Sequence, residues 1–170
     1  MRAPNLLSLL CVLFFAVPAV AKVGPLPIER LVTGSDEIVI ATVTDVSSAP
    51  TQDMQPVYAN AVVQRALKGS LAGAFRFRAY PTWSCDVSDA VKDEAVLLFL
   101  KRDSDGTFSI QYAGRGRMPL RVADGRTYVT LWDDVVLPAA APTIAGPDPR
   151  YSFIVSVELE YIESLIVKSR

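Results

Sequence analysis

Histidine is absent from the 170 residues of this chain. Without an imidazole, the Ser-His-Asp and Cys-His arrangements of nucleophilic catalysis are excluded. Zinc sites that use histidine ligands are excluded for the same reason. From the sequence we assign no catalytic residue, no metal ligand and no cofactor-binding residue.

Cysteine is scarce, because only Cys11 and Cys85 occur. Cys11 lies in an apolar N-terminal run that we expect to be removed, so Cys85 would stand alone in the mature protein. A lone cysteine makes neither an intramolecular disulfide nor a thiolate zinc site, unlike the cysteines of disulfide-stapled secreted domains. Cys85 is then buried and inert, reactive, or paired between two chains, and the sequence leaves these three alternatives open.

The N-terminus has the pattern of a secretory signal peptide. Arg2 supplies the positive charge, residues 6–17 form the apolar stretch, Pro18 interrupts it, and residues 19–21 are small at the positions that a signal peptidase reads. We expect cleavage after residue 21 and export to the periplasm or the extracellular space.

A membrane anchor and a lipoprotein are the alternatives for this leader. The apolar run is shorter than the roughly 20 residues that cross a bilayer. Leu10 is large where a lipoprotein that begins at Cys11 needs a small residue. We expect no transmembrane segment after cleavage.

Charge gives no argument for a nucleic-acid partner. One of the 17 basic residues lies in the leader, and all 18 acidic residues follow it. The mature chain is therefore nearly neutral, which provides no long-range attraction for phosphates. Residues 22–170 are enough for one domain that buries its own core.

Glu94 to Leu100 form the most apolar run outside the leader, and charged residues bound it on both sides. Such a run indicates a strand buried on both faces or a buried helix segment, and its length favours the strand. Alternation and β-branched residues predict further strands, and four-residue spacing of apolar side chains predicts helices. We expect strands over residues 37–46, 57–67, 74–80, 107–112 and 127–132, a short helix over 28–32, and an amphipathic helix from Phe153 to Lys168 capped by Ser152.

Four segments follow from this pattern. Residues 1–21 are the signal peptide, 22–138 a β-barrel domain, 139–151 a linker rich in proline and alanine, and 152–170 a helix packed on the barrel. Glycines in the segment from Gly114 to Leu120 break the strand pattern there.

Five short motifs support a family resemblance. They are Ser35 to Val39 at the start of a strand, Leu67-Lys68-Gly69 at the end of another, Cys85 in a loop, Leu97 to Leu100, and Gly114 to Gly116. In this order they resemble exported bacterial proteins whose OB-type barrel is similar to the modules of the tissue inhibitors of metalloproteinases (TIMP) and of netrins. The resemblance implies a mainly β fold: a small OB-like antiparallel barrel with a short N-terminal and a C-terminal amphipathic helix. Most bacterial proteins of this group have no assigned function.

The likeness covers residues 28–120, and the chain departs from the animal inhibitors at a decisive point. Those inhibitors chelate zinc through an N-terminal cysteine and are rich in disulfides. The expected mature N-terminus is Lys22-Val23-Gly24. Metalloprotease inhibition by that chemistry is therefore not carried over.

The best polar cluster consists of side chains from two segments that flank the apolar strand. One hypothesis is that Arg115 and Arg117, with nearby backbone amides, contact an anion or carboxylate. The alternative is an internal salt bridge from one arginine to Asp86 or Asp89. The other members of this candidate contact site are Trp83, Cys85 and Asp86.

Arg76 and Arg78 are a second candidate contact, on the solvent-facing side of an alternating strand. The alternative, which the pattern favours, is a solvated face without function. The acidic pairs Asp93-Glu94 and Asp133-Asp134 are interpreted as solvated strand ends and turns, not as paired glycosidase carboxylates.

Together these features predict an exported, non-enzymatic binding module for a protein or cell-envelope partner. Two alternatives stay open. One is a hydrolase that depends on carboxylates or a metal. The other is a structural subunit of an envelope assembly, joined through the C-terminal helix or Cys85.

Overall fold

The computed structural model describes residues 24–47, 57–79, 81, 86–145 and 155–169. The leader, Trp83, Cys85 and Ser152 lie outside these residues. The elements are β1 (Leu26–Pro27), α2 (Ile28–Gly34), β2 (Glu37–Val46), β3 (Tyr58–Lys68), β4 (Ala74–Arg78), β5 (Ala95–Arg102), β6 (Phe108–Ile110), β7 (Arg117–Ala123), β8 (Arg126–Thr130), β9 (Val135–Val136), β10 (Thr143–Ala145), β11 (Val155–Glu158) and α3 (Leu159–Lys168).

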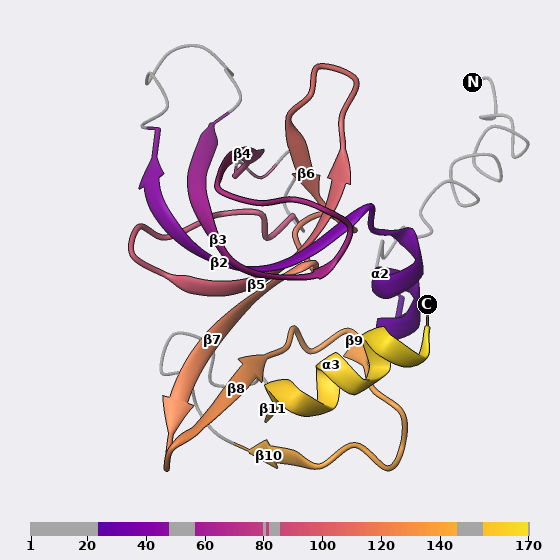
Figure 1. Ribbon diagram of the computed structural model, residues 1–170. Coiled ribbons are helices and arrows are strands. Elements are labelled where there is room, and N and C mark those ends of the chain that lie inside the picture. Colours follow the sequence, from indigo (N-terminus) through magenta and orange to yellow (C-terminus); the bar gives the residue numbers. More distant parts are fainter. Residues whose placement is uncertain (1–23, 48–56, 80, 82–85, 146–154, 170) are drawn as a thin grey trace, which may run out of the picture.

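Five strands close into a barrel (Figure 1). Around the barrel the order is β2, β3, β4, β6 and β5, and β5 pairs again with β2. Every pair in this ring is antiparallel except β4–β6, which is parallel and aligns Phe77 with Phe108. A five-stranded Greek-key ring of this kind is an OB-like barrel. The predicted fold class is therefore confirmed: the chain is mainly β, with one short helix near the start and another at the C-terminal end.

β5 is buried on both faces, as its apolar run predicts. Val96, Leu98 and Leu100 point into the barrel, where they join a core that includes the rings of β4 and β6. Leu97 and Phe99 point the other way, into a second core outside the barrel. All five side chains are fully buried. The strand is therefore a wall shared by two hydrophobic cores.

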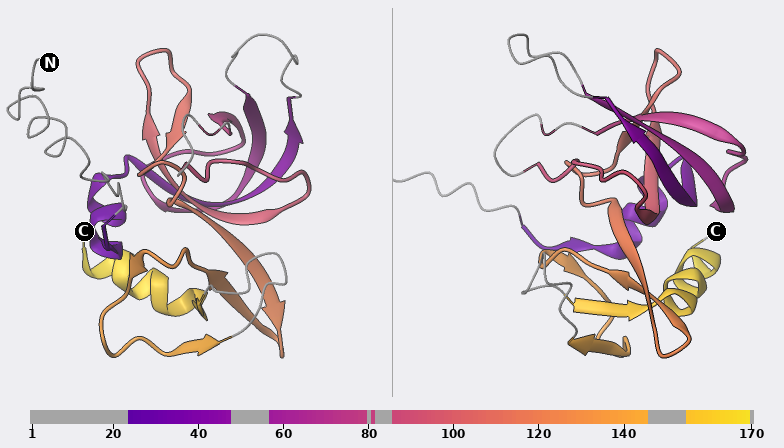
Figure 2. Two further views of the ribbon diagram at one scale, coloured as in Figure 1. Left: turned by 180° about the vertical axis from the view of Figure 1, so that it is seen from behind. Right: turned by 90° about the vertical axis from the view of Figure 1, so that its left-hand side faces the viewer.

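The second core belongs to a C-terminal module that lies beside the barrel (Figure 2). β7 connects the two parts, because it pairs with β5 through Leu97 and Met118 and then with β8. β8, β11 and β10 continue as an antiparallel sheet. Helices α2 and α3 contact each other and contribute Leu31, Ile162 and other buried side chains to this core.

The C-terminal helix is shorter than its spacing predicts. It begins at Leu159, and Val155–Glu158 form strand β11, which pairs with β8 by aligning Val157 with Val129. The apolar residues at 155 and 157 also fit a two-residue period, and pairing with β8 selects that period over the helical one. Ile162 and Ile166 are buried, as the helical spacing of the remaining segment predicts.

Two further segments contain strands where the sequence predicted irregular structure. Strand β10 lies within the stretch interpreted as a linker, and β7 begins inside the segment that breaks the strand pattern. Pro119 is tolerated in β7 because its pairing within the described residues is to β5 alone, so its missing N–H leaves no second ladder incomplete.

Candidate functional site

The two segments predicted to flank the apolar strand do meet. The Val87 backbone N–H donates to the Ala113 carbonyl oxygen at 3.0 Å. Gly114 has φ +88°, and a Cβ added there would lie 2.7 Å from the Val87 carbonyl oxygen and closer still to the Ser88 nitrogen. Only glycine allows the backbones to approach this closely. Asp86 turns the loop, because its Oδ1 accepts the Ser88 N–H at 2.9 Å.

A left-handed turn forms one side of this meeting point. Tyr112 and Ala113 both have φ 51°, and Gly114 continues the left-handed conformation. The Gly116 N–H closes the turn by donating to the Gln111 carbonyl oxygen at 3.0 Å. Consecutive non-glycine residues in this region are strained and need surrounding contacts to hold them.

Arg117 is fully buried and makes a bidentate ion pair with Glu94. Its Nε donates to Glu94 Oε1 at 2.8 Å, and its Nη2 donates to Oε2. The side chains are 2% and 4% exposed, so the pair is withdrawn from solvent. The Trp132 indole N–H donates to the Arg117 carbonyl oxygen at 3.0 Å, which ties the C-terminal module to the same residue.

Arg115 also pairs inside the molecule. Its Nε donates to Asp134 Oδ2 at 2.8 Å, and its Nη1 donates to the Ala113 carbonyl oxygen at 3.1 Å. Asp134 precedes β9 in the C-terminal module, so this pair crosses from the barrel turn to that module. The geometry favours internal salt bridges for both arginines, in which Asp134 pairs with Arg115 and Glu94 pairs with Arg117.

The interpretation of Glu94 and Asp134 as solvated was wrong. Both side chains are largely buried and face arginines, whereas their neighbours Asp93 and Asp133 are exposed as predicted. The sequence does not reveal that Glu94 and Arg117 are partners, because they are 23 positions apart and meet only through the pairing of β5 with β7.

Arg76 and Arg78 lie on the outer face of β4, and Phe75 and Phe77 point into the barrel, as the alternation predicts. The Arg76 guanidinium carbon lies 3.8 Å from the centre of the Tyr58 ring on β3. Within the described part of the chain, Arg76 has no carboxylate partner. Of the candidate arginines, it is the one whose charge is not matched by an ion pair there.

Arg78 faces the hairpin between β5 and β6. Its Nε lies 3.4 Å from Asp103 Oδ2, and its Nη2 lies 3.8 Å from Asp105 Oδ2. Asp105 Oδ1 accepts the Thr107 N–H at 3.0 Å and the Thr107 hydroxyl at 2.6 Å. These bonds, and more weakly the charge of Arg78, lower the pKa of Asp105. The hairpin therefore places two carboxylates beside Arg78 of β4.

A polar network around Glu37 and Lys68 attaches α2 to the barrel. Glu37 is buried and its Oε2 accepts the backbone N–H groups of Ser70 and Leu71 at 2.8 and 2.9 Å. Lys68 Nζ donates to the carbonyl oxygens of Val32 and Ser35, both at 2.7 Å, at the end of α2. A cation at a helix C-terminus is stabilising. The Ser-Asp-Glu and Lys-Gly motifs of the sequence are thus explained by structure, since they attach α2 to the barrel.

No family model matches the chain, and a search of curated proteins finds no relative of it. Among the described residues, no three His, Cys, Asp or Glu side chains gather closely enough to hold a metal ion. Neither α2 nor α3 has the length and apolar character needed to cross a membrane.

Proposed function

We propose that this protein is an exported, non-enzymatic binding module that contacts a protein or cell-envelope partner through the outer face of β3 and β4. The observation that carries the proposal is the Arg76 guanidinium, which stacks 3.8 Å from the Tyr58 ring centre and has no carboxylate partner among the described residues. Its charge is available to a partner, whereas Arg115 and Arg117 hold the molecule together.

Stacking prepares Arg76 for recognition. A guanidinium held against an aromatic ring keeps its planar set of donors directed outward, and this set matches the two oxygens of a carboxylate or phosphate. Holding the side chain in place also reduces the conformational entropy that binding would otherwise cost. Asn60, exposed on β3 directly opposite Arg76, adds an amide beside it.

The position of this face in the barrel supports the same proposal. OB-like barrels place ligands on the face of their second and third strands and on the adjoining loops. Those strands are β3 and β4 here, and the β5–β6 hairpin adjoins them through Arg78 and Asp103. The fold alone does not select the ligand, so the partner class follows from Arg76: an acidic group on a protein or an envelope polymer.

Export follows from the N-terminal leader, and with it the periplasm or the extracellular space as the place of action. The OB-like barrel is also what the resemblance to bacterial TIMP/netrin-like proteins implies, and we retain that relationship as part of the proposal.

The test is affinity purification from the envelope and secreted fractions of the protein's own host. Exported wild-type protein, an Arg76→Glu variant and an Arg30→Glu variant serve as baits. Arg30 is an exposed arginine on α2, far from β4 in the sequence, and is the matched control. We expect one partner to be recovered with wild type and Arg30→Glu and lost with Arg76→Glu. Equal recovery with all three baits would rule out this face.

A further inference from the structure

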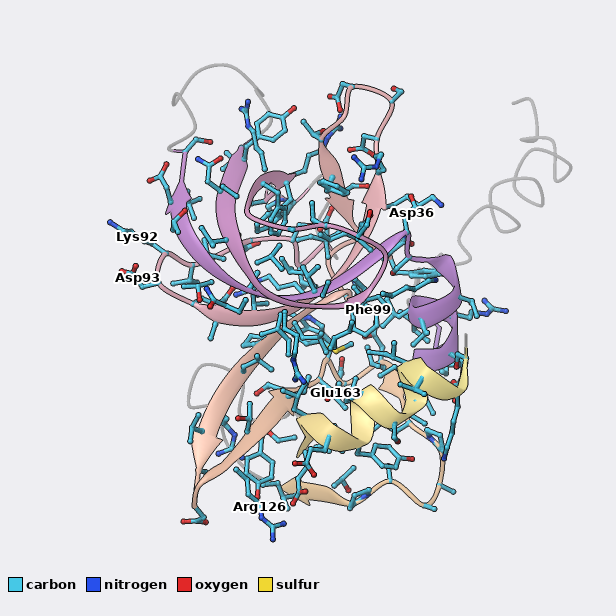
Figure 3. The ribbon with its side chains drawn as sticks, in the orientation of Figure 1. Asp36, Lys92, Asp93, Phe99, Arg126 and Glu163 are labelled. Carbon is cyan, nitrogen blue, oxygen red and sulfur yellow. The ribbon has the colours of Figure 1, made fainter. Side chains whose placement is uncertain are left out.

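A cavity of about 590 Å³ lies where the barrel meets the C-terminal module. Arg65 of β3 lines it from the barrel, Arg126 of β8 lines it from the hairpin, and α3 contributes Glu160 and Glu163. Arg126 and Glu163 are labelled in Figure 3. Arg65 lies farther along β3 than Asn60, the residue opposite Arg76, and the other lining residues belong to the C-terminal module. The volume is within the range of about 300–1,000 Å³ that is typical of small-molecule sites, but the lining is mainly charged, whereas most such sites are mainly apolar.

The lining is charged with both signs. Arg65 pairs with Glu163, with Nη1 at 3.3 Å from Oε2, and Arg126 pairs with Glu158. The arginine side chains are 53% and 65% exposed, so their remaining donors face water. Glu160 is exposed and has no hydrogen bond or ion pair among the described residues. Two cations therefore face three carboxylates, and Glu160 is the unmatched charge.

Glu160 of α3 and Arg126 of β8 line the same cavity. The pKa of Arg126 is raised, first by its hydrogen bond with Glu158 and, more weakly, by the charge of Glu160. The unmatched carboxylate and the exposed guanidinium thus belong to one site. A ligand in this cavity meets a cation and an anion within a single small volume.

We propose that this cavity binds a small diamino acid, whose carboxylate contacts Arg126 and whose ammonium groups contact Glu160 and the neighbouring glutamates. The two arginines match two of the three glutamates, so a simple anion is repelled by the one excess carboxylate, and a simple diamine lacks a group for the guanidinium donors. A zwitterion with one additional ammonium group carries both signs and neutralises the excess negative charge. Such charge matching selects ligands even where each contact is exposed and individually weak.

The ligand contacts would be solvent-exposed, which has a measurable consequence. Exposed charge pairs are screened by salt over about 8 Å at physiological ionic strength. Binding of the diamino acid is therefore expected to weaken steadily as sodium chloride is added. Binding driven by apolar burial would not weaken in this way.

Calorimetric and NMR titrations of the purified protein test the proposal with four probes. These are lysine, norleucine, which lacks the side-chain ammonium, 1,5-diaminopentane, which lacks the carboxylate, and glutamate. We expect lysine to bind most tightly and glutamate not to bind. We expect shifts in the amide signals of Thr127 and Glu160. No lysine binding at millimolar concentration, or equal binding of lysine and norleucine, would overturn the proposal.

Variants separate this site from general surface charge. Glu160→Gln is expected to weaken lysine binding about two- to fivefold, which is the effect of losing one solvent-exposed charge pair. Glu29→Gln is the matched control, because Glu29 is also a first-turn glutamate, on α2, and does not line the cavity. Arg76→Glu is expected to leave lysine binding unchanged. Equal affinities of the Glu160→Gln and Glu29→Gln proteins would refute the assignment.

Discussion

Arg117 Nε lies 2.8 Å from Glu94 Oε1, and both side chains are buried at the junction between the barrel and the C-terminal module. The two residues are 23 positions apart in the sequence and meet because β7 pairs with β5. A buried guanidinium without its acid is an uncompensated charge in a medium that solvates it poorly. This pair is therefore the most sensitive polar contact of the fold.

Removing one partner of this pair should destabilise the protein strongly. For Glu94→Gln or Arg117→Met we expect the free energy of unfolding to fall by about 3–5 kcal/mol, because one charge is left buried and unpaired. Urea unfolding followed by circular dichroism measures this change. The double variant Glu94→Leu/Arg117→Met should recover most of the loss. A loss below about 1 kcal/mol in the single variants, the level of a surface pair, would contradict the buried geometry.

Gly114 and Gly106 form a matched pair for testing the contact between the two loops. Both have positive φ, but a Cβ at Gly106 meets nothing within 4 Å, whereas one at Gly114 meets the Val87–Ser88 backbone. Gly106→Ala should cost about 1–2 kcal/mol for the left-handed conformation alone. Gly114→Ala adds overpacking and should cost at least about 3 kcal/mol. Equal losses in thermal or urea unfolding would mean that the loops do not touch.

Asp36 gives the protein a predictable response to acid. The side-chain hydrogen bond from Lys101 at 2.6 Å and the Arg102 backbone N–H at 2.9 Å lower the pKa of Asp36 below its ordinary 3.8. A carboxyl with a lowered folded pKa stabilises the native state above its unfolded pKa, and this contribution disappears as pH falls through the folded value.

The difference in unfolding free energy between wild type and Asp36→Asn should therefore be constant near neutrality and shrink once pH falls below 3.8. In an NMR titration, Lys101→Met should move the pKa of Asp36 back towards its ordinary value. An unchanged titration curve in that variant would show that Lys101 does not hold the carboxyl.

The Tyr58 ring should matter for partner binding through Arg76. Tyr58→Leu removes the aromatic face. An exposed cation–π contact contributes about 0.5–1 kcal/mol, so the dissociation constant for the captured partner should rise about two- to fivefold. Tyr58→Phe keeps the ring and should bind like wild type. If Tyr58→Phe and Tyr58→Leu weaken binding equally, the hydroxyl group and not the stacking is responsible.

The sequence was informative where local pattern and burial agree. The run from Glu94 to Leu100 correctly predicted a strand buried on both faces, and the alternation from Phe75 to Arg78 correctly separated core from solvent. It failed at Val155 to Glu158, where two periods fit the same apolar residues. Pairing with β8 then decided the outcome, and no local feature of the segment contains that information.

The candidate arginines show the same division. Residue types and turn glycines marked the Gly114 to Arg117 segment as unusual, and the loops meet where the order of elements predicted. Asp134 pairs with Arg115 and Glu94 pairs with Arg117, and the sequence alone did not single out these acids. The charged cavity could not be predicted from the sequence either, because β3, β8 and α3 contribute to it from distant parts of the chain.

By itself, the sequence excluded histidine-dependent catalysis and determined the mainly β character, because these depend on composition and on short-range periodicity. Export stays a prediction from the leader. Only the tertiary structure decided which charges are matched and which remain available. Pairing of β5 with β7 and packing of the second module withdraw Arg115 and Arg117 from solvent, and the same fold leaves Arg76 and Glu160 facing it. An ion pair depends on distance in space, and a linear pattern does not specify that distance until the strands are in register.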